Sequence, residues 1–124
     1  MNNQLSGNEI WSEEYEGQLA VDVYQTPEEI ILKAPIAGVK PEELEISITD
    51  EIINIKGERK DAETVTRDNY FAQECYWGSF SRSFVLPIPV DSEKSNASLK
   101  NGILTIRLPK QEKTKTKTIE IKTE

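Results

Sequence analysis

Apolar and polar residues alternate with a period of two along most of the chain, which is the pattern of half-buried β-strands. Helical periodicity is almost absent. Strands are predicted in six segments, at 19–23, 29–34, 44–49, 52–59, 79–86 and 103–108. Several short strands at this spacing, divided by turn residues, predict an all-β fold of the immunoglobulin-like β-sandwich type.

Two turn signals set the register of two predicted hairpins. A two-residue loop at 50–51 gathers five apolar residues on one face: Leu44, Ile46, Ile48, Ile53 and Ile55. Asn101-Gly102 is the strongest hairpin signal, because both residue types tolerate the positive φ of a type I′ turn. That loop gathers a second apolar face: Ala97, Leu99, Leu104, Ile106 and Leu108. Two hairpins with one apolar side each are what two stacked sheets require.

Between the hairpins lies a long segment, residues 60–77. Its first half is polar, whereas its second half carries four aromatic residues, Tyr70, Phe71, Tyr76 and Trp77. A long loop without secondary structure in a compact domain usually has a function or is disordered. Two interpretations stay open on the pattern alone: the loop folds back on its own sandwich, or a partner chain covers the rings.

The composition and charge of the chain exclude some classes of binding partner and indicate its cellular compartment. The chain has 124 residues, which suits one domain, and its net charge of -7 argues against sequence-blind binding to nucleic acid or to an anionic membrane. No stretch approaches the roughly 20 apolar residues of a membrane helix, and the start lacks the features of a signal peptide. The single cysteine, Cys75, cannot form an internal disulfide. We therefore expect a cytoplasmic protein.

The residues needed for most catalytic chemistry are missing from the sequence. There is no histidine, so Cys75 has no partner to activate it as a nucleophile and a zinc site is nearly excluded. The glycines are scattered and form no phosphate-binding loop. Acidic pairs such as Glu42-Glu43 are interpreted as solvated turn residues. We expect a non-enzyme that is ATP-independent and holds no cofactor or metal.

Three blocks of sequence resemble the small heat-shock proteins. GSFSRSFVLP at 78–87 resembles their Gly-x-Phe-x-Arg-x-Phe-x-Leu-Pro strand, and ASLKNGILTIRLPK at 97–110 resembles their Ala-x-Leu-x-Asn-Gly signature. Residues 21–48 are similar to the opening strands of the same domain. The resemblance implies three parts: a short N-terminal arm at 1–17, an α-crystallin domain of the Hsp20 family at 18–110, and a flexible C-terminal extension at 111–124.

The extension carries two isoleucines in an otherwise polar stretch. Ile119-Glu120-Ile121 resembles the Ile-x-Ile anchor of the family, and in an extended strand both isoleucine side chains point the same way. Without the resemblance, a frayed tail with chance isoleucines would be the preferred interpretation. The resemblance implies docking into an edge groove of a neighbouring subunit, with walls formed by Leu44, Ile46, Ile48 and Leu99.

A dimer interface is also implied by the resemblance. Arg82 alternates with Phe80 and Phe84, so on an apolar face it needs a carboxylate or backbone partner. The family equivalent pairs at the dimer interface; the alternative is a side chain that reaches out to water. Segment 60–77 matches the region that non-animal members exchange to form a strand-swapped homodimer, which would use Tyr70, Phe71, Tyr76 and Trp77.

The implied function is that of an ATP-independent chaperone that binds partly unfolded client proteins and prevents their aggregation, assembling from dimers into a higher homo-oligomer. The N-terminal arm is shorter than in many relatives, and its apolar residues are expected to contact clients: Ile10, Trp11 and Tyr15. Two other classes stay open. One is a monomeric co-chaperone adaptor; the other is a carbohydrate-binding sandwich whose aromatic platform would be Tyr70, Phe71 and Trp77.

Overall fold

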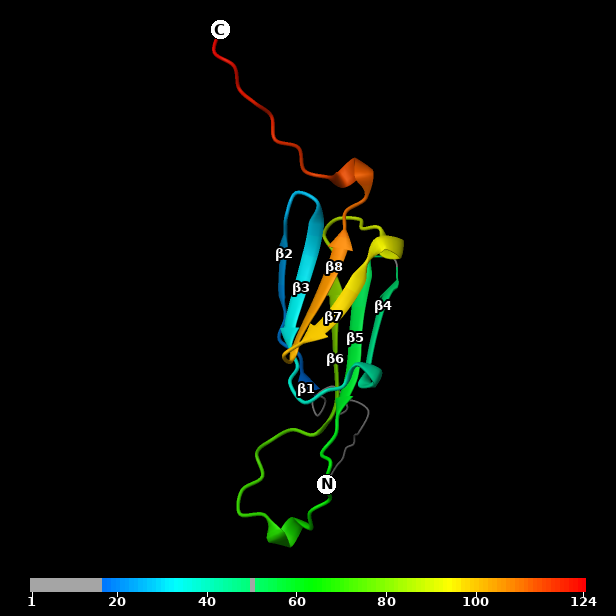
Figure 1. The fold of residues 1–124 in the computed structure, drawn as a ribbon, viewed down its shortest axis with the longest axis vertical. Helices are drawn as coiled ribbons and strands as arrows, with labels where there is room; N and C mark the ends of the chain where they lie inside the picture. The colour runs from blue at the N-terminus through cyan, green and yellow to red at the C-terminus, as the bar shows by residue number, and fades with distance from the viewer. Residues whose placement is uncertain (1–16, 50) are drawn as a thin grey trace, which may run out of the picture.

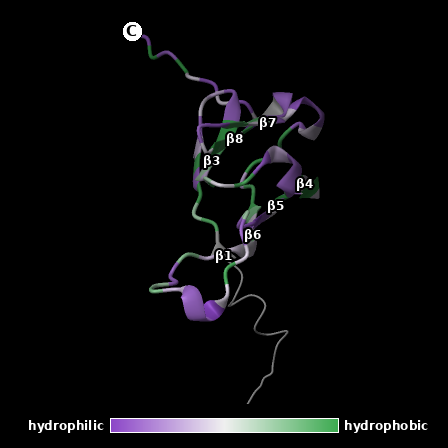
Figure 2. Cartoon of the chain, turned by 60° about the horizontal axis from the view of Figure 1, so that its bottom comes forward, coloured by the Kyte–Doolittle hydropathy of each residue, from purple (hydrophilic) through white to green (hydrophobic). Residues whose placement is uncertain are grey.

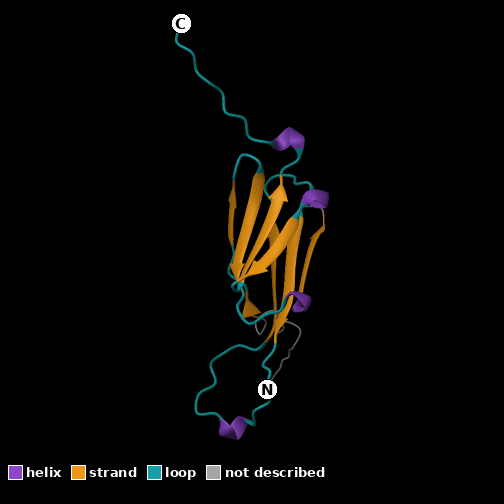
Figure 3. Cartoon of the chain, in the orientation of Figure 1, coloured by secondary structure: helices purple, strands orange, loops and turns teal. Residues whose placement is uncertain are grey.

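Two four-stranded sheets pack face to face in the computed structural model, which describes residues 17–49 and 51–124 (Figures 1 and 3). The first sheet has the order β1-β6-β5-β4 and the second β2-β3-β8-β7. The strands are β1 (Gly17–Gln18), β2 (Asp22–Gln25), β3 (Glu29–Pro35), β4 (Leu44–Thr49), β5 (Ile52–Arg59), β6 (Gly78–Val85), β7 (Asn96–Lys100) and β8 (Ile103–Pro109). The predicted β-sandwich is confirmed.

Short 3-10 turns are the only helical elements in the part of the chain described. They are η1 (Pro41–Glu43), η2 (Arg67–Asn69), η3 (Ser92–Lys94) and η4 (Glu112–Thr114). Three residues predicted to contact clients, Ile10, Trp11 and Tyr15, lie outside the described residues.

Both predicted hairpins form with the expected register. β4 pairs with β5 so that Ile46 lies opposite Ile55, and β7 pairs with β8 so that Ala97 lies opposite Ile106. In the 101–102 turn the backbone φ angles are 53° at the asparagine and 77° at the glycine, as a type I′ turn requires. Apolar side chains of each hairpin therefore face the other sheet.

The hydrophobic core lies between the sheets, and alternate residues of β8 are buried in it. Its largest fully buried side chains are Ile30, Leu32, Ile36, Ile53, Ile55, Leu86, Leu104, Ile106 and Leu108. Each such side chain contributes about 1.5–3 kcal/mol of burial free energy. One boundary differs from the prediction: Leu19 is buried but lies outside a strand, and β2 begins at Asp22.

The long loop and the C-terminal tail leave the sandwich at opposite ends (Figure 1). Residues 60–77 connect the end of β5 to the start of β6 and extend away from the sheets, and Figure 2 shows their η2 turn as hydrophilic. The tail follows β8 at the other end. Each end of the sandwich thus presents a segment that can reach a second molecule.

Candidate functional site

A groove separates the edge strand of one sheet from the edge strand of the other. β4 and β7 are the edges concerned, and the groove between them has a volume of about 300 Å³. It is lined by Ile46, Ile48, Ser92, Ser95, Asn96, Ala97 and Ile106. Ile106 belongs to the buried core, whereas Ile46 and Ile48 are half-buried because an edge strand has no further neighbour to cover them.

Side-chain size explains where this groove opens. Ala97 lies opposite Ile106 in the β7–β8 pair, and its single methyl group leaves space above that isoleucine. The isoleucines of β4 line the opposite wall, so the floor and one wall are apolar. Ser92, Ser95 and Asn96, around η3, supply a polar rim.

The structure places two of the four predicted wall residues in this groove. Ile46 and Ile48 line it, whereas Leu44 and Leu99 are absent from its lining, although all four side chains pack against the core. The η3 residues could not be predicted from the sequence, because a short turn has no hydrophobic periodicity. The signal for Ala97 was present in the predicted hairpin, where a small residue faces a large one.

The tail carries two apolar side chains that this chain does not cover. Ile119 is 79% exposed and Ile121 is 94% exposed. Residues 117–124 have no regular secondary structure. The tail thus offers two uncovered isoleucines at a spacing of two, and the groove offers an apolar floor. Their pairing between copies of the chain stays a prediction.

A second apolar groove follows the edge strand β2. It has a volume of about 300 Å³ and is lined by Val23, Tyr24, Gln25, Ile30, Phe84, Pro87 and Ile88. This groove could not be predicted from the sequence, because the position of β2 at a sheet edge follows from the strand order and not from any local pattern. An open strand edge beside an apolar groove is suited to bind an extended segment.

The aromatic residues of the long loop are mostly uncovered within this chain. Phe71 is fully exposed, Tyr76 is 39% and Trp77 is 45% exposed, while Tyr70 is half-buried. The Tyr76 hydroxyl donates a hydrogen bond of 2.6 Å to the carbonyl of Ser79. None of these rings belongs to the core cluster of the described residues. A partner that covers them, as the strand-swapped homodimer would, stays a prediction.

Arg82 finds its partner inside its own chain. Its Nη1 donates a hydrogen bond of 2.7 Å to the carbonyl of Leu19, and the side chain is half-buried. Because Phe80 and Phe84 share its face of β6, this backbone oxygen supplies the polar contact that a cation needs on an apolar surface. The bond joins β6 to the segment after β1, and the predicted role at a dimer interface is untested.

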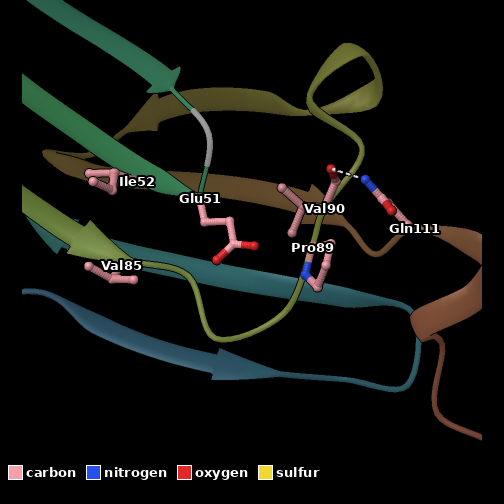
Figure 4. A pocket seen from close by; sticks show the side chains of 6 residues that line it. All are labelled: Glu51, Ile52, Val85, Pro89, Val90 and Gln111. Carbon is pink, nitrogen blue, oxygen red and sulfur yellow. Dashed lines mark hydrogen bonds between the residues drawn. The ribbon is translucent and has the colours of Figure 1, made fainter.

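A third pocket lies at the tail end of the sandwich (Figure 4). It has a volume of about 470 Å³ and is lined by Glu51, Ile52, Val85, Pro89, Val90 and Gln111. Two of its apolar side chains, Ile52 and Val85, face each other across β5 and β6 and are 40% and 64% exposed. The Gln111 Nε2 donates a hydrogen bond of 3.4 Å to the carbonyl of Val90.

Residues 17–49 and 51–124 contain neither a metal-binding cluster nor a membrane-spanning helix. That part of the chain has no group of three or more histidine, cysteine, aspartate or glutamate side chains arranged to hold a metal ion. Its cysteine, Cys75, is a free and exposed thiol. No helix there is both long and apolar enough to cross a membrane.

The chain is thus an all-β sandwich with apolar grooves at its sheet edges and two uncovered isoleucines in its tail. The Hsp20/alpha crystallin family model matches residues 22–122, and the chain belongs to that family.

Relatives and solved structures agree with this assignment. Spore protein SP21 of Stigmatella aurantiaca is 36% identical over 102 residues, which are 82% of this chain and 60% of that protein. Small heat shock protein C2 of Rickettsia felis is 36% identical over 101 residues, 82% of this chain and 66% of that protein. The chain thus spans 60% and 66% of the length of these two relatives. Heat shock protein 16.0 from Schizosaccharomyces pombe superposes with a TM-score of 0.73 at 32% identity, covering 86% of this chain and all of that one.

Proposed function

We propose that the chain is an ATP-independent chaperone of the cytoplasm, which binds partly unfolded proteins and slows their aggregation without covalent chemistry. Membership of the Hsp20/alpha crystallin family supports this proposal. So does the sequence, which offers no histidine and no phosphate-binding loop. Binding an unfolded state lowers its free concentration, and aggregation falls steeply as a result.

Assembly is the first part of the proposed mechanism. Ile119 and Ile121 of one copy dock into the β4–β7 groove of another, with both side chains on the apolar floor. Burying two isoleucines yields roughly 3–6 kcal/mol, from which the ordering of a polar tail must be subtracted. One contact is therefore weak and reversible, and many contacts in a closed assembly hold together by multivalency. The coexistence of an uncovered apolar groove and an uncovered isoleucine pair is the observation that carries the proposal.

Dimerisation is the second part. The long loop of one copy adds an extended segment to the free edge of β2 in its partner, by strand addition. The groove beside β2 would receive one of the loop's aromatic rings, of which Phe71 is fully exposed. Both copies do this reciprocally, as a two-fold symmetric dimer requires.

Client binding is the third part. When a tail leaves its groove, the apolar floor becomes available to an extended apolar segment of an unfolding protein. Ile10, Trp11 and Tyr15 of the N-terminal arm would add further apolar contact. Clients and tails then compete for one surface, so warming, which releases weak anchors, exposes binding sites when unfolded proteins appear.

Light scattering of a heat-aggregating protein tests the proposed function. We expect an equimolar amount of this chain to delay and reduce the scattering without any nucleotide, because it holds unfolded chains apart. An unrelated β-sandwich protein at the same concentration serves as the control. Unchanged scattering at molar excess of this chain, together with binding to a glycan array, would favour the carbohydrate-binding alternative.

A further inference from the structure

Among the side chains that the structure describes, Lys110 is the only polar or charged one that is buried, with 2% exposed. Its ammonium donates hydrogen bonds of 2.8 Å to Gln25 Oε1 and 3.1 Å to Thr116 Oγ1. No carboxylate of the described residues forms an ion pair with it. A buried ammonium is unfavourable unless polar atoms replace its water, so this site depends on the two oxygens.

Two backbone hydrogen bonds run beside these side chains. The Lys110 amide donates to the carbonyl of Glu28 at 2.9 Å, and the Thr116 amide donates to the carbonyl of Pro27 at 3.3 Å. Both bonds end in the turn between β2 and β3. We call the side chains of Gln25, Lys110 and Thr116 the tail bracket, because they fasten the first residues of the tail to this turn.

The same stretch of tail is also held on its other side. The Gln111 amide donates to the carbonyl of Pro89 at 3.3 Å, and its side chain donates to the carbonyl of Val90 (Figure 4). The hydroxyl of Thr114 donates to the carbonyl of Gln111 at 2.8 Å and also lies 3.4 Å from the carbonyl of Pro89. Residues 111–116 therefore lie between two loops of the sandwich.

An exposed ion pair adds to this arrangement. The Lys115 ammonium lies 3.1 Å from Glu28 Oε1 and 3.4 Å from Glu112 Oε2. The hydrogen bond to Glu28 raises the pKa of Lys115, with a further contribution from the charge of Glu112. This pair lies at the surface, where such pairs stabilise little.

We propose that Lys110 is a positioning residue, which fastens the tail as far as Thr116 and thereby limits how far the anchor Ile119-Glu120-Ile121 reaches. From Thr116, the three residues to Ile119 span about 10 Å when fully extended. From Lys110, the nine residues to Ile119 would span about 30 Å. Together with the contacts of Gln111, Thr114 and Lys115, the tail bracket thus shortens the reach of the anchor by about two thirds.

The proposal rests on the docking role assigned above to Ile119 and Ile121, and it concerns the geometry of that docking. A short reach admits only neighbours whose groove lies near the tail end of the sandwich, in a narrow range of orientations. Repeated contacts of one orientation close into an assembly of one size. Release of the bracket leaves the isoleucines unchanged but lets them reach grooves in many orientations, so assemblies of several sizes form.

A distance measurement tests the bracket itself. Spin labels are placed at Thr105→Cys and Thr118→Cys in a full-length chain with Cys75→Ser, diluted with unlabelled chains so that distances are within one copy. We expect a narrow distance distribution for the parent chain and one at least about twice as wide for Lys110→Met, which keeps an apolar stem but loses both hydrogen bonds. Lys117→Met, one residue beyond the bracket, is the matched control and should keep the narrow distribution.

The mass distribution tests the consequence for assembly. Native mass spectrometry should show one dominant species for the parent chain and for Lys117→Met, and several species for Lys110→Met. A six-residue Gly-Ser spacer inserted after Thr116 leaves the bracket intact and restores the longer reach, so it should broaden the masses as Lys110→Met does. If Lys110 served only to stabilise the fold, the spacer variant would keep the mass distribution of the parent chain.

The outcomes separate this proposal from the proposed function. Equal distance distributions for the parent and Lys110→Met would overturn the bracket, as would a spacer variant with the parent's masses. Should Lys110→Met fail to fold, Thr116→Val is used in its place in both experiments. This substitution removes one hydrogen-bond acceptor of Lys110 at an exposed position. The parent chain could also show a narrow distribution of spin-label distances and yet be monomeric at all concentrations. That result would refute the docking role of the anchor and leave the fastening of the tail supported.

Discussion

Replacing both Ile119 and Ile121 with serine is expected to reduce the assembly to dimers of the 14.1 kDa chain. Both side chains are almost fully exposed within their own copy, so their removal leaves the sandwich intact. It takes away the roughly 3–6 kcal/mol of burial that the proposed docking assigns to each tail. Since about 1.4 kcal/mol is a factor of ten, each contact should weaken at least about 100-fold. Light scattering coupled to size-exclusion chromatography measures the mass.

A matched control is available in the same tail. Thr118→Ser with Thr123→Ser changes two neighbours of the anchor and removes only methyl groups. This control should keep the mass of the parent chain. The docking role of the isoleucines is contradicted if the doubly substituted Ile→Ser chain keeps the parent's mass, or if both variants lose it equally.

Gly57→Ala is expected to lower the free energy of unfolding by about 1–3 kcal/mol or more, as overpacking in a core does. Gly57 lies on the inward face of β5, opposite Phe80 in β6 and Leu44 in β4. A Cβ atom there would come within 2.5 Å of Phe80 Cζ and 2.9 Å of Leu44 Cδ2. Phe80 is 4% exposed, and the guanidinium of Arg59 lies 5.8 Å from its ring centre, so the ring has little room to retreat.

Chemical denaturation of both proteins, followed by circular dichroism, measures this effect. Glu58→Ala is the control, because Glu58 is the next residue of the same strand and points to solvent. Its free energy of unfolding should change by less than about 0.5 kcal/mol. If Gly57→Ala proves as stable as the parent, the close packing of Phe80 over this glycine is contradicted.

The features that the sequence predicted well are those set by neighbours along the chain. Period-two alternation and a two-residue turn fix which residues share a face, so the opposition of Ile46 to Ile55 was predictable. The same local signals placed Asn101 in its turn with a positive φ. The alternation of Arg82 with Phe80 and Phe84 was likewise sufficient to predict that its side chain needs a polar partner.

What could not be predicted depends on contacts between distant segments. The sheet order decides that β4, β7 and β2 are edges, and therefore where grooves open. Leu44 and Leu99 have the right residue type for a groove wall, but the groove opens beside Ile46 and Ile48, and alternation along a strand does not say where along an edge a groove opens. The tail bracket joins Lys110 to Gln25, which is 85 positions away, and no periodicity links two such residues.

The central claim is that copies of this chain join by placing the tail isoleucines of one in the β4–β7 groove of another. Photo-crosslinking measures this contact directly, with a diazirine amino acid in place of Ile121 and a mixture of light- and heavy-isotope chains. We predict cross-links between light and heavy chains, at residues 46–48 or 92–97. Cross-links confined to single chains, or between chains at positions away from that groove, would contradict the claim.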